Sequence, residues 1–171
     1  MSAKVILVLG SNLGDRVLSL LRAVKAVSAC GEIERVGSLF ITSPFGIIEQ
    51  PEFLNVALSL TTELAPLELL DSFKKIEIEI GRVETYRWGP RAIDIDIALF
   101  GDLILDSARL KIPHPGLVTR DFFIAPILEI EPDATEPVSG KSLSIFLEKI
   151  PESEKTIKGY FQDKRWLSII T

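Results

Sequence analysis

Two aspartates follow a group of arginines in the middle of this chain of 171 residues. Arg82, Arg87 and Arg91 come first, and Asp94 and Asp96 then interrupt an apolar run. In a β-strand, alternation would place both carboxylates on one face, roughly 6.6 Å apart at the backbone. Two anions on one face repel each other unless water or a cation lies between them. The spacing therefore predicts a strand with a possible cation site.

The chemistry that suits these residues is phosphoryl transfer. Mg²⁺ prefers one or two carboxylates together with water and substrate phosphates, and arginines hold phosphate oxygens in a fork. Metal ion, polyphosphate and guanidinium together are typical of phosphoryl transfer. A half-buried strand with a solvated polar face would explain an isolated Asp-x-Asp pair equally well. The arginines immediately upstream favour the chemical interpretation.

Hydrophobic periodicity predicts the elements that position this stretch. Alternating or β-branched runs predict strands at 4–9, 33–42 and 53–61, and around the two aspartates. Helical spacing predicts one helix after Asp15, which ends at Gly31, and a second that begins at Pro66 and ends at Gly81. The resulting order is β-α-β-β-α-β. This order predicts an α/β (α+β) protein with a ferredoxin-like core, an antiparallel sheet and both helices on one face.

Further elements are expected after this core. Gly101 and Asp102 predict a hairpin turn into a strand at 103–105. Residues 122–130 predict a short helix bent at Pro126, and 143–150 a last amphipathic helix. The pattern after Pro151 supports no assignment. The length suits a single domain over residues 1–171.

Composition narrows the function. Hydrophobic residues make up 47% and charged residues 25%, while the net charge is −5 and the pI about 5.0. No overall positive field would draw the protein to nucleic acid or to an anionic membrane, so the arginines suggest a local anion site. Cys30 is the single cysteine, which fits a reducing compartment. With no signal peptide or membrane span in evidence, we expect a cytoplasmic protein, and a monomer.

Two glycine-containing segments resemble nucleotide-binding motifs without meeting their requirements. Gly140-Lys141-Ser142 lacks the glycine that a phosphate-binding loop needs five positions earlier, where Thr135 stands. The segment at 10–14 lacks the dinucleotide-binding spacing. We interpret it as a structural joint between the first strand and the first helix.

Taken together, several segments closely resemble the 6-hydroxymethyl-7,8-dihydropterin pyrophosphokinase family of folate biosynthesis. The matching segments are LGSNLGDR at 9–16, EQPEFLNVA at 49–57, GRV at 81–83, RWGPRAIDIDIALFG at 87–101 and IPHPGLVTRDFFIAPILEI at 112–130. The resemblance implies that the pterin hydroxymethyl group attacks the β-phosphorus of ATP. Pyrophosphate would be transferred and AMP released, with no covalent enzyme intermediate.

The resemblance also implies site residues. Asp94 and Asp96 would ligate two Mg²⁺ ions and form the catalytic group with Arg82 and Arg91. The ATP-binding residues that it implies are Glu77, Arg82, Arg91, Ile97, Arg109, His114 and Arg120. The pterin-binding residues that it implies are Thr42, Phe45, Phe53, Asn55, Trp88 and Phe122.

Some of these residues have an alternative structural interpretation. Phe53 and Phe122 would enclose the pterin ring while Asn55 binds its edge, but without the resemblance both phenylalanines would be assigned to the core. Glu77 could equally be an exposed helix residue. Trp88 could belong to a lid or be buried by packing.

Two loops, at 43–51 and 83–90, are predicted lids over the substrates. The family often carries a second arginine two positions after the first in the phosphate loop. Glu84 stands there in this chain, and repulsion from the triphosphate should keep it out of the site. The identity of any general base stays open between Asp96 and water.

Two other functions are compatible with parts of this pattern. A small metal-dependent nucleotidyltransferase would release pyrophosphate from ATP, whereas a pyrophosphokinase releases AMP. A non-catalytic ferredoxin-like module could bind RNA or a small regulator, but RNA binding would require a basic face with exposed aromatics. The acidic pI weighs against RNA.

Overall fold

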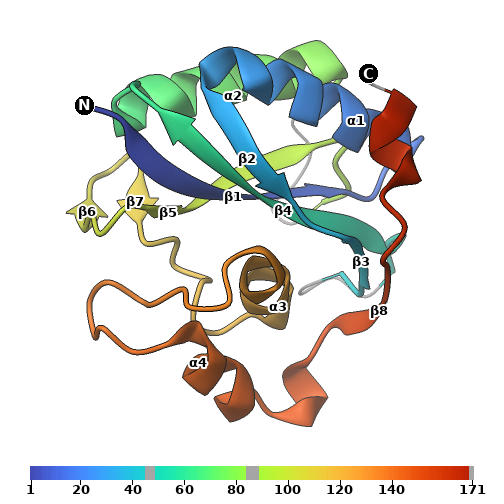
Figure 1. Ribbon diagram of the computed structural model, residues 1–171. Helices are drawn as coiled ribbons and strands as arrows, with labels where there is room; N and C mark the ends of the chain where they lie inside the picture. Colours follow the sequence, from blue (N-terminus) through green and yellow to red (C-terminus); the bar gives the residue numbers. More distant parts are fainter. Residues whose placement is uncertain (45–48, 84–88, 170–171) are drawn as a thin grey trace.

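The computed structural model describes residues 1–44, 49–83 and 89–169, in three layers (Figure 1). A six-stranded antiparallel sheet forms the middle layer, with strand order β5-β1-β4-β3-β8 and with β2 also paired to β4. Its strands are β1 (Ala3–Ser11), β2 (Glu32–Val36), β3 (Leu39–Thr42), β4 (Phe53–Thr62), β5 (Asp94–Phe100) and β8 (Ile157–Phe161).

Helices cover both faces of the sheet. α1 (Arg16–Val27) and α2 (Pro66–Ile80) lie together on one face, while α3 (Asp121–Ile130) and α4 (Leu143–Lys149) lie on the other (Figure 1). Each face has its own apolar core, with Phe73 of α2 fully buried in one and Phe123 of α3 in the other. The predicted ferredoxin-like βαββαβ core, with an antiparallel sheet and both core helices on one face, is confirmed.

The two core helices begin and end where local chemistry requires. The Asp15 carboxylate caps α1 by accepting a hydrogen bond from the Leu18 amide at 3.0 Å. Glu68 accepts one from the Ala65 amide at the start of α2 at 2.8 Å. Gly81 ends α2 with a φ of 115°, a conformation that favours glycine. This turn directs the following residue, Arg82, toward the sheet.

The strand predicted at 33–42 is divided in two. β2 and β3 both pair with β4, but regular pairing is interrupted at Gly37 and Ser38, although the Gly37 amide still donates to the Ala57 carbonyl at 2.9 Å. Glu129 of α3 accepts hydrogen bonds there from the amide and the hydroxyl of Ser38. A side chain at Gly37 would come within 2.8 Å of the same carboxylate. A residue more than 90 positions away therefore interrupts the strand.

The hairpin predicted at 101–105 is wrong in its pairing. A turn does occur at Gly101, where the Leu103 amide donates to the Phe100 carbonyl at 3.0 Å. The next strand, β6 (Leu105–Asp106), pairs with β7 (Lys111–Ile112) instead of β5. The free edge of β5 is used by the following loop, because the His114 amide donates to the Ala98 carbonyl at 3.0 Å. The extra hairpin is therefore β6–β7.

The C-terminal part combines confirmed and missed elements. α3 contains Pro126 as expected, and α4 occupies most of the predicted last helix. The chain then forms two 3₁₀ turns, η2 (Glu152–Glu154) and η3 (Arg165–Ile169). Another 3₁₀ turn, η1 (Ser28–Cys30), directly follows α1 near the start of the chain. Between η2 and η3 lies β8, which sequence patterns did not predict. No helix within the described part of the chain is long and apolar enough to span a membrane.

Candidate active site

A cavity of about 400 Å³ opens where one end of the sheet meets the start of α3. Residues far apart in the sequence meet around it. Its lining includes Thr42, Phe53, Asn55, Arg82, Arg91, Asp94, Asp96, His114, Arg120 and Phe122, all of which were predicted for the site. Val8, Gly10, Ser43, Lys74 and Phe123 complete the wall. The residues predicted for phosphate and those predicted for pterin therefore share one cavity.

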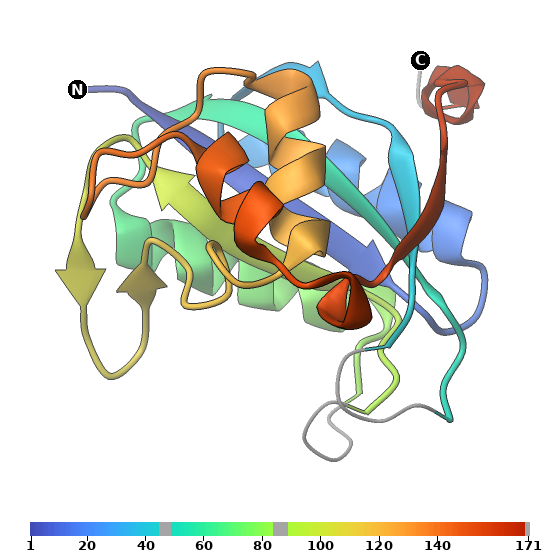
Figure 2. The ribbon, with the colours of Figure 1, turned by 90° about the horizontal axis from the view of Figure 1, so that it is seen from below.

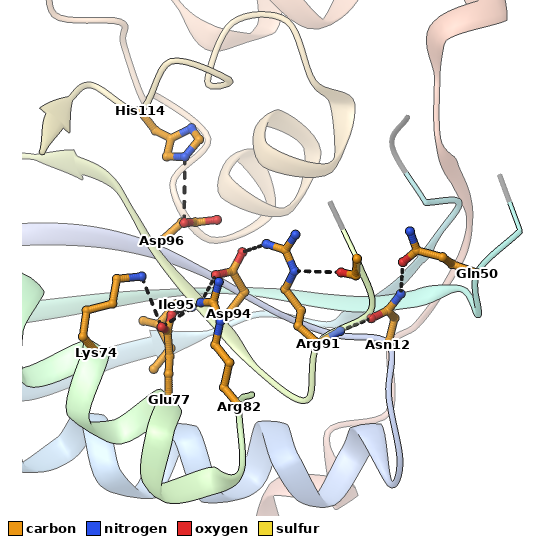
Figure 3. A network of polar contacts seen from close by, with 11 residues as sticks. Asn12, Gln50, Lys74, Glu77, Arg82, Arg91, Asp94, Ile95, Asp96 and His114 are labelled. Atoms are coloured by element: carbon orange, nitrogen blue, oxygen red, sulfur yellow. Dashed lines mark hydrogen bonds and ion pairs between the residues drawn. The ribbon is translucent and has the colours of Figure 1, made fainter. Parts of the chain in front are cut away.

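Asp94 lies between two arginines at the start of β5. One carboxylate oxygen accepts a hydrogen bond from Arg82 at 2.8 Å and the other from Arg91 at 3.0 Å (Figure 3). Burial acts to lower the pKa of Arg82, but Asp94 and Glu77 raise it above its usual value. The Arg82 guanidinium is thus held charged at the cavity wall.

Asp96 has a weaker set of partners. It follows Asp94 on the same face of β5, with Ile95 buried on the opposite face between them. Within the described residues its contact is His114, whose Nε2 lies 3.8 Å from Oδ1. Burial and then the neighbouring Asp94 raise the pKa of Asp96 well above its usual value. This carboxylate would gain from a cation in the cavity.

The aspartate pair fits Mg²⁺. Within the described residues no group of three or more His, Cys, Asp or Glu side chains could hold a metal ion. Asp94 and Asp96 nevertheless present two carboxylates to one cavity that arginines also line. Mg²⁺ usually takes one or two carboxylates and completes its shell with water and substrate phosphates. The donor set is suited to a metal ion that arrives with a polyphosphate.

Glu77 is buried beneath this cluster, with 1% of its surface exposed. Oε2 accepts from Arg82 at 2.7 Å and from Lys74 at 3.1 Å, while Oε1 accepts from the Ile95 amide at 2.8 Å. The alternative that Glu77 is an exposed helix residue is therefore wrong. The side chain joins the last turn of α2 to the start of β5 and orients Arg82 (Figure 3).

His114 directs a proton toward the aspartates. Its Nδ1 accepts a hydrogen bond from the Gly116 amide at 2.9 Å, which leaves the proton of the neutral imidazole on Nε2. The ring stacks on Phe123 with centroids 4.4 Å apart. Burial, followed by the charge of Arg120, lowers the pKa of His114 to about 4. At neutral pH the side chain is thus an uncharged donor facing Asp96 (Figure 3).

The opposite end of the cavity combines an amide with aromatic rings. The Asn55 amide donates to the Thr42 hydroxyl at 2.7 Å, and both side chains are buried. Phe53 and Phe122 are only partly buried, because each presents part of its ring to the cavity. Phe53 is thus a cavity residue, while Phe122 both lines the cavity and packs against the core around Phe123. Phe123, the next residue, occupies the core position.

A second, shallower cavity of about 260 Å³ adjoins the first. Lys74, Asp96 and His114 line both. The other lining residues of the second cavity are Leu70, Ile95, Ile97, Ser107, Ala108, Arg109, Leu110, Lys111 and Pro115. Ile97 and Arg109, predicted for ATP, thus lie beside the aspartate pair, and Arg109 also pairs with Asp71 of α2.

Sequence reasoning missed several residues in and around the cavity, including Lys74, Gly10 and Asn12. Lys74 was absent from the prediction although it lines both cavities, and only its helical position relative to Glu77 could have indicated it. Gly10 was assigned to a structural joint, yet a side chain there would come within 2.4 Å of the Asn55 amide oxygen. Asn12 was assigned to the same joint.

Asn12 connects two loops at the cavity rim. Its side chain donates to the Gln50 side chain at 3.1 Å and to the Pro51 carbonyl at 3.2 Å, and accepts from the Arg91 amide at 2.8 Å (Figure 3). Its own amide donates to the Arg91 carbonyl at 3.1 Å. Asn12 is 1% exposed, so these bonds are protected from water. It fixes the backbone that carries Arg91.

The remaining predictions lie outside the described residues. These are the pterin-binding roles of Phe45 and Trp88, the exclusion of Glu84, and the parts of the two predicted lids at 45–48 and 84–88.

The fold and the site define a phosphoryl-group transferase whose aspartate pair is suited to a divalent cation. A profile of the family described as 7,8-dihydro-6-hydroxymethylpterin-pyrophosphokinase matches residues 6–132. The 2-amino-4-hydroxy-6-hydroxymethyldihydropteridine pyrophosphokinase of Aquifex aeolicus is 43% identical over 158 residues, which cover 92% of this chain and 96% of the relative. The Pseudomonas aeruginosa protein of the same name is 40% identical over 88% of this chain and 94% of its own length.

A solved structure agrees in fold. Plasmodium falciparum HPPK-DHPS, a longer protein, superposes with a TM-score of 0.72 at 16% identity, over 87% of this chain and 43% of the other. The chain belongs to the 6-hydroxymethyl-7,8-dihydropterin pyrophosphokinase family, as its motifs predicted. It is an enzyme of folate synthesis that transfers pyrophosphate from ATP to the hydroxymethyl group of the pterin. Enzymes of this family use ATP, for which Mg²⁺ is generally expected. The nucleotidyltransferase and the non-catalytic module are not favoured.

Proposed function

We propose that the cavity between β5 and α3 performs this transfer, with two Mg²⁺ ions held by Asp94 and Asp96. The observation that carries the proposal is that one cavity is lined by both aspartates, by three arginines and by the Phe53–Asn55–Phe122 group. Two Mg²⁺ ions, when bound, would neutralise phosphate charge as the bond to the α-phosphate oxygen breaks.

Different residues of the chain bind the phosphates, bind the nucleoside and position Arg82. Arg82 and Arg91 bind the phosphates from the Asp94 side, and Arg120 and the Nε2 proton of His114 bind them from the opposite wall. The nucleoside occupies the adjoining cavity beside Ile97 and Arg109. Glu77 contributes by positioning Arg82, since its carboxylate contacts Arg82 and lines neither cavity.

The pterin lies at the other end of the same cavity. Phe53 and Phe122 enclose its ring, and Asn55, held by Thr42, binds the donor and acceptor groups on its edge. Pterin-binding roles for Phe45 and Trp88 are part of the proposal on the family resemblance alone. The hydroxymethyl oxygen then faces the β-phosphorus, so catalysis rests on positioning and electrostatic stabilisation. We further propose that residues 1–171 act as one domain, as a cytoplasmic monomer.

The test is to incubate the protein with ATP, Mg²⁺ and 6-hydroxymethyl-7,8-dihydropterin and to identify the nucleotide released. AMP should form only with the pterin present. An Asp94→Ala, Asp96→Ala variant should lose this activity, whereas Asp102→Asn, an exposed carboxylate two residues past β5, should retain it. Pterin-independent release of pyrophosphate would contradict the proposal.

The number of metal ions needs a separate measurement. Mg²⁺ binding in the presence of a non-hydrolysable ATP analogue should saturate at two ions per chain and fall in each single aspartate variant. Saturation at one ion would remove the two-ion part of the proposal and leave the reaction unchanged.

A further inference from the structure

The C-terminal strand β8 lies against the pterin end of the cavity. It runs alongside β3 at the edge of the sheet (Figure 2). In this pairing Ile157 lies opposite Thr42. Just before β8, the Thr156 carbonyl accepts a hydrogen bond from the Ser43 amide at 2.9 Å. Thr42 and Ser43 both line the cavity. The matched part of the family ends at residue 132, so this contact comes from outside it.

Asp121 anchors this segment to α3. Its carboxylate accepts three hydrogen bonds from the chain just before and within β8: from the Thr156 amide at 2.8 Å, the Thr156 hydroxyl at 2.7 Å and the Ile157 amide at 2.9 Å. The side chain is 2% exposed, and an unpaired carboxylate at such a position would be strongly unfavourable. Three donors from one short segment satisfy it.

The position of Asp121 in the sequence links the anchor to the site. It is the first residue of α3 and stands between Arg120 and Phe122, both of which line the cavity. The same carboxylate therefore joins the wall formed by α3 to the wall formed by the end of β3.

β8 also reaches the far end of the connection between β3 and β4. The Lys158 ammonium pairs with the Glu52 carboxylate at 2.7 Å, directly before Phe53. Because both groups are exposed, this pair contributes little by itself. The segment nevertheless contacts the chain on both sides of the connection, at Ser43 and at Glu52.

We propose that Asp121 is a positioning residue for pterin binding, which acts by anchoring β8 between α3 and the end of β3. The anchor fixes Thr42, and through it Asn55, at a set distance from Phe122. A flat ring enclosed between two walls requires that separation to be held within a fraction of an ångström. The proposal rests on the placement of the pterin in this cavity. It assigns a role to the tail that sequence patterns left unexplained.

The test compares two substitutions of Asp121 in the full-length protein. Asp121→Ala removes all three acceptor contacts and should raise the Kd for 6-hydroxymethyl-7,8-dihydropterin about tenfold. Asp121→Asn keeps an oxygen for the two amides, and its NH₂ can donate to the Thr156 hydroxyl. We therefore expect this variant to bind pterin within about threefold of the original protein.

The readout that separates positioning from general destabilisation is the Kd for an ATP analogue with Mg²⁺. It should change less than the Kd for the pterin in both variants, because Arg82 and Arg91 are held by Glu77 and Asp94, and of the phosphate-binding arginines only Arg120 adjoins Asp121. If Asp121→Ala is poorly folded, Thr156→Val supplies the same comparison, since it removes one donor and keeps both amides. Glu152→Ala, which alters only an exposed ion pair of the tail, is the matched control and should bind both ligands normally.

The outcomes are distinct. Failure of the unsubstituted protein to bind the pterin would overturn the proposed function itself. Normal pterin binding by Asp121→Ala, or an equal loss of affinity for both ligands, would overturn the positioning role alone. Faster amide hydrogen exchange at Thr156 and Ile157 in Asp121→Ala, together with selective loss of pterin affinity, would support it.

Discussion

Replacement of Glu77 by glutamine should loosen the phosphate-binding end of the site. Glu77→Gln keeps the size of the side chain, and its amide oxygen can still accept from the Ile95 amide. Its NH₂ group would then face the Arg82 guanidinium and the Lys74 ammonium, which now lie 2.7 and 3.1 Å from the carboxylate. Donors would oppose donors, so Arg82 would keep Asp94 as its remaining partner in the cluster.

The magnitude follows from the exposure of the partners. A hydrogen bond to a charged group is worth about 1.5–3 kcal/mol. The Lys74 side chain is 50% exposed and can be solvated instead, whereas the Arg82 side chain is 26% exposed and can be solvated only in part. We therefore expect the free energy of unfolding to fall by about 2–3 kcal/mol, most of it from the Arg82 contact.

The assay combines urea unfolding with steady-state kinetics. Because Arg82 would lose its hydrogen bond to residue 77, kcat/KM for ATP should fall about tenfold or more, while the Kd for the pterin stays within about twofold. Glu79→Gln, an exposed residue of the same helix, is the control and should leave both quantities unchanged. A loss of stability below about 0.5 kcal/mol with unaltered kinetics would refute the reasoning.

Three further predictions concern other parts of the site. Asn12→Ala removes the bonds to Gln50, Pro51 and Arg91 and leaves the partly buried Arg91 amide without this acceptor, so urea unfolding should show a loss of about 2–4 kcal/mol; an unchanged midpoint would contradict this. Asp96→Asn should weaken Mg²⁺ binding in the presence of an ATP analogue by about tenfold or more in calorimetry, and undiminished binding would exclude Asp96 as a ligand. His114 has a folded pKa of about 4, below its usual 6.5, so its contribution to stability is complete above pH 6.5 and is lost as pH falls toward 4. Without Mg²⁺, stability of the original protein relative to His114→Gln should therefore decline by about 3 kcal/mol over that interval, and a constant difference would contradict the shift.

Features that depend on residues close together in the chain, such as strand alternation and helix ends, were predictable from the sequence. Alternation placed Asp94 and Asp96 on one face of a strand, and Pro66 and Gly81 delimited α2. These features depend on backbone geometry and on side chains a few positions apart, which act before any distant contact forms. The order of these elements then sufficed for the ferredoxin-like core.

Contacts between distant segments were decided only by the tertiary structure. Glu129 divides the strand at Gly37–Ser38, and the loop at His114 occupies the edge of β5 where a hairpin was expected. β8 has too little alternation to be recognised, and it becomes a strand because β3 offers it an edge and Asp121 holds its first amide. None of these partners is identifiable from local periodicity.

The same division applies to the site. Residue types and spacing were enough to predict the aspartates and the arginines before them, whereas Asn55 and the two phenylalanines were predicted only through the resemblance to the family; these residues line one cavity. Residue types and spacing did not predict which side chains are buried or which groups they bond. Glu77 and Asn12 look like ordinary polar residues in the sequence, but in the structure both are buried and connect separate segments of the chain. The sequence by itself determined which groups could bind phosphate and a flat ring. Only the tertiary structure decided which side chains hold those groups in place, because a buried polar group is defined by the donors and acceptors that folding brings to it.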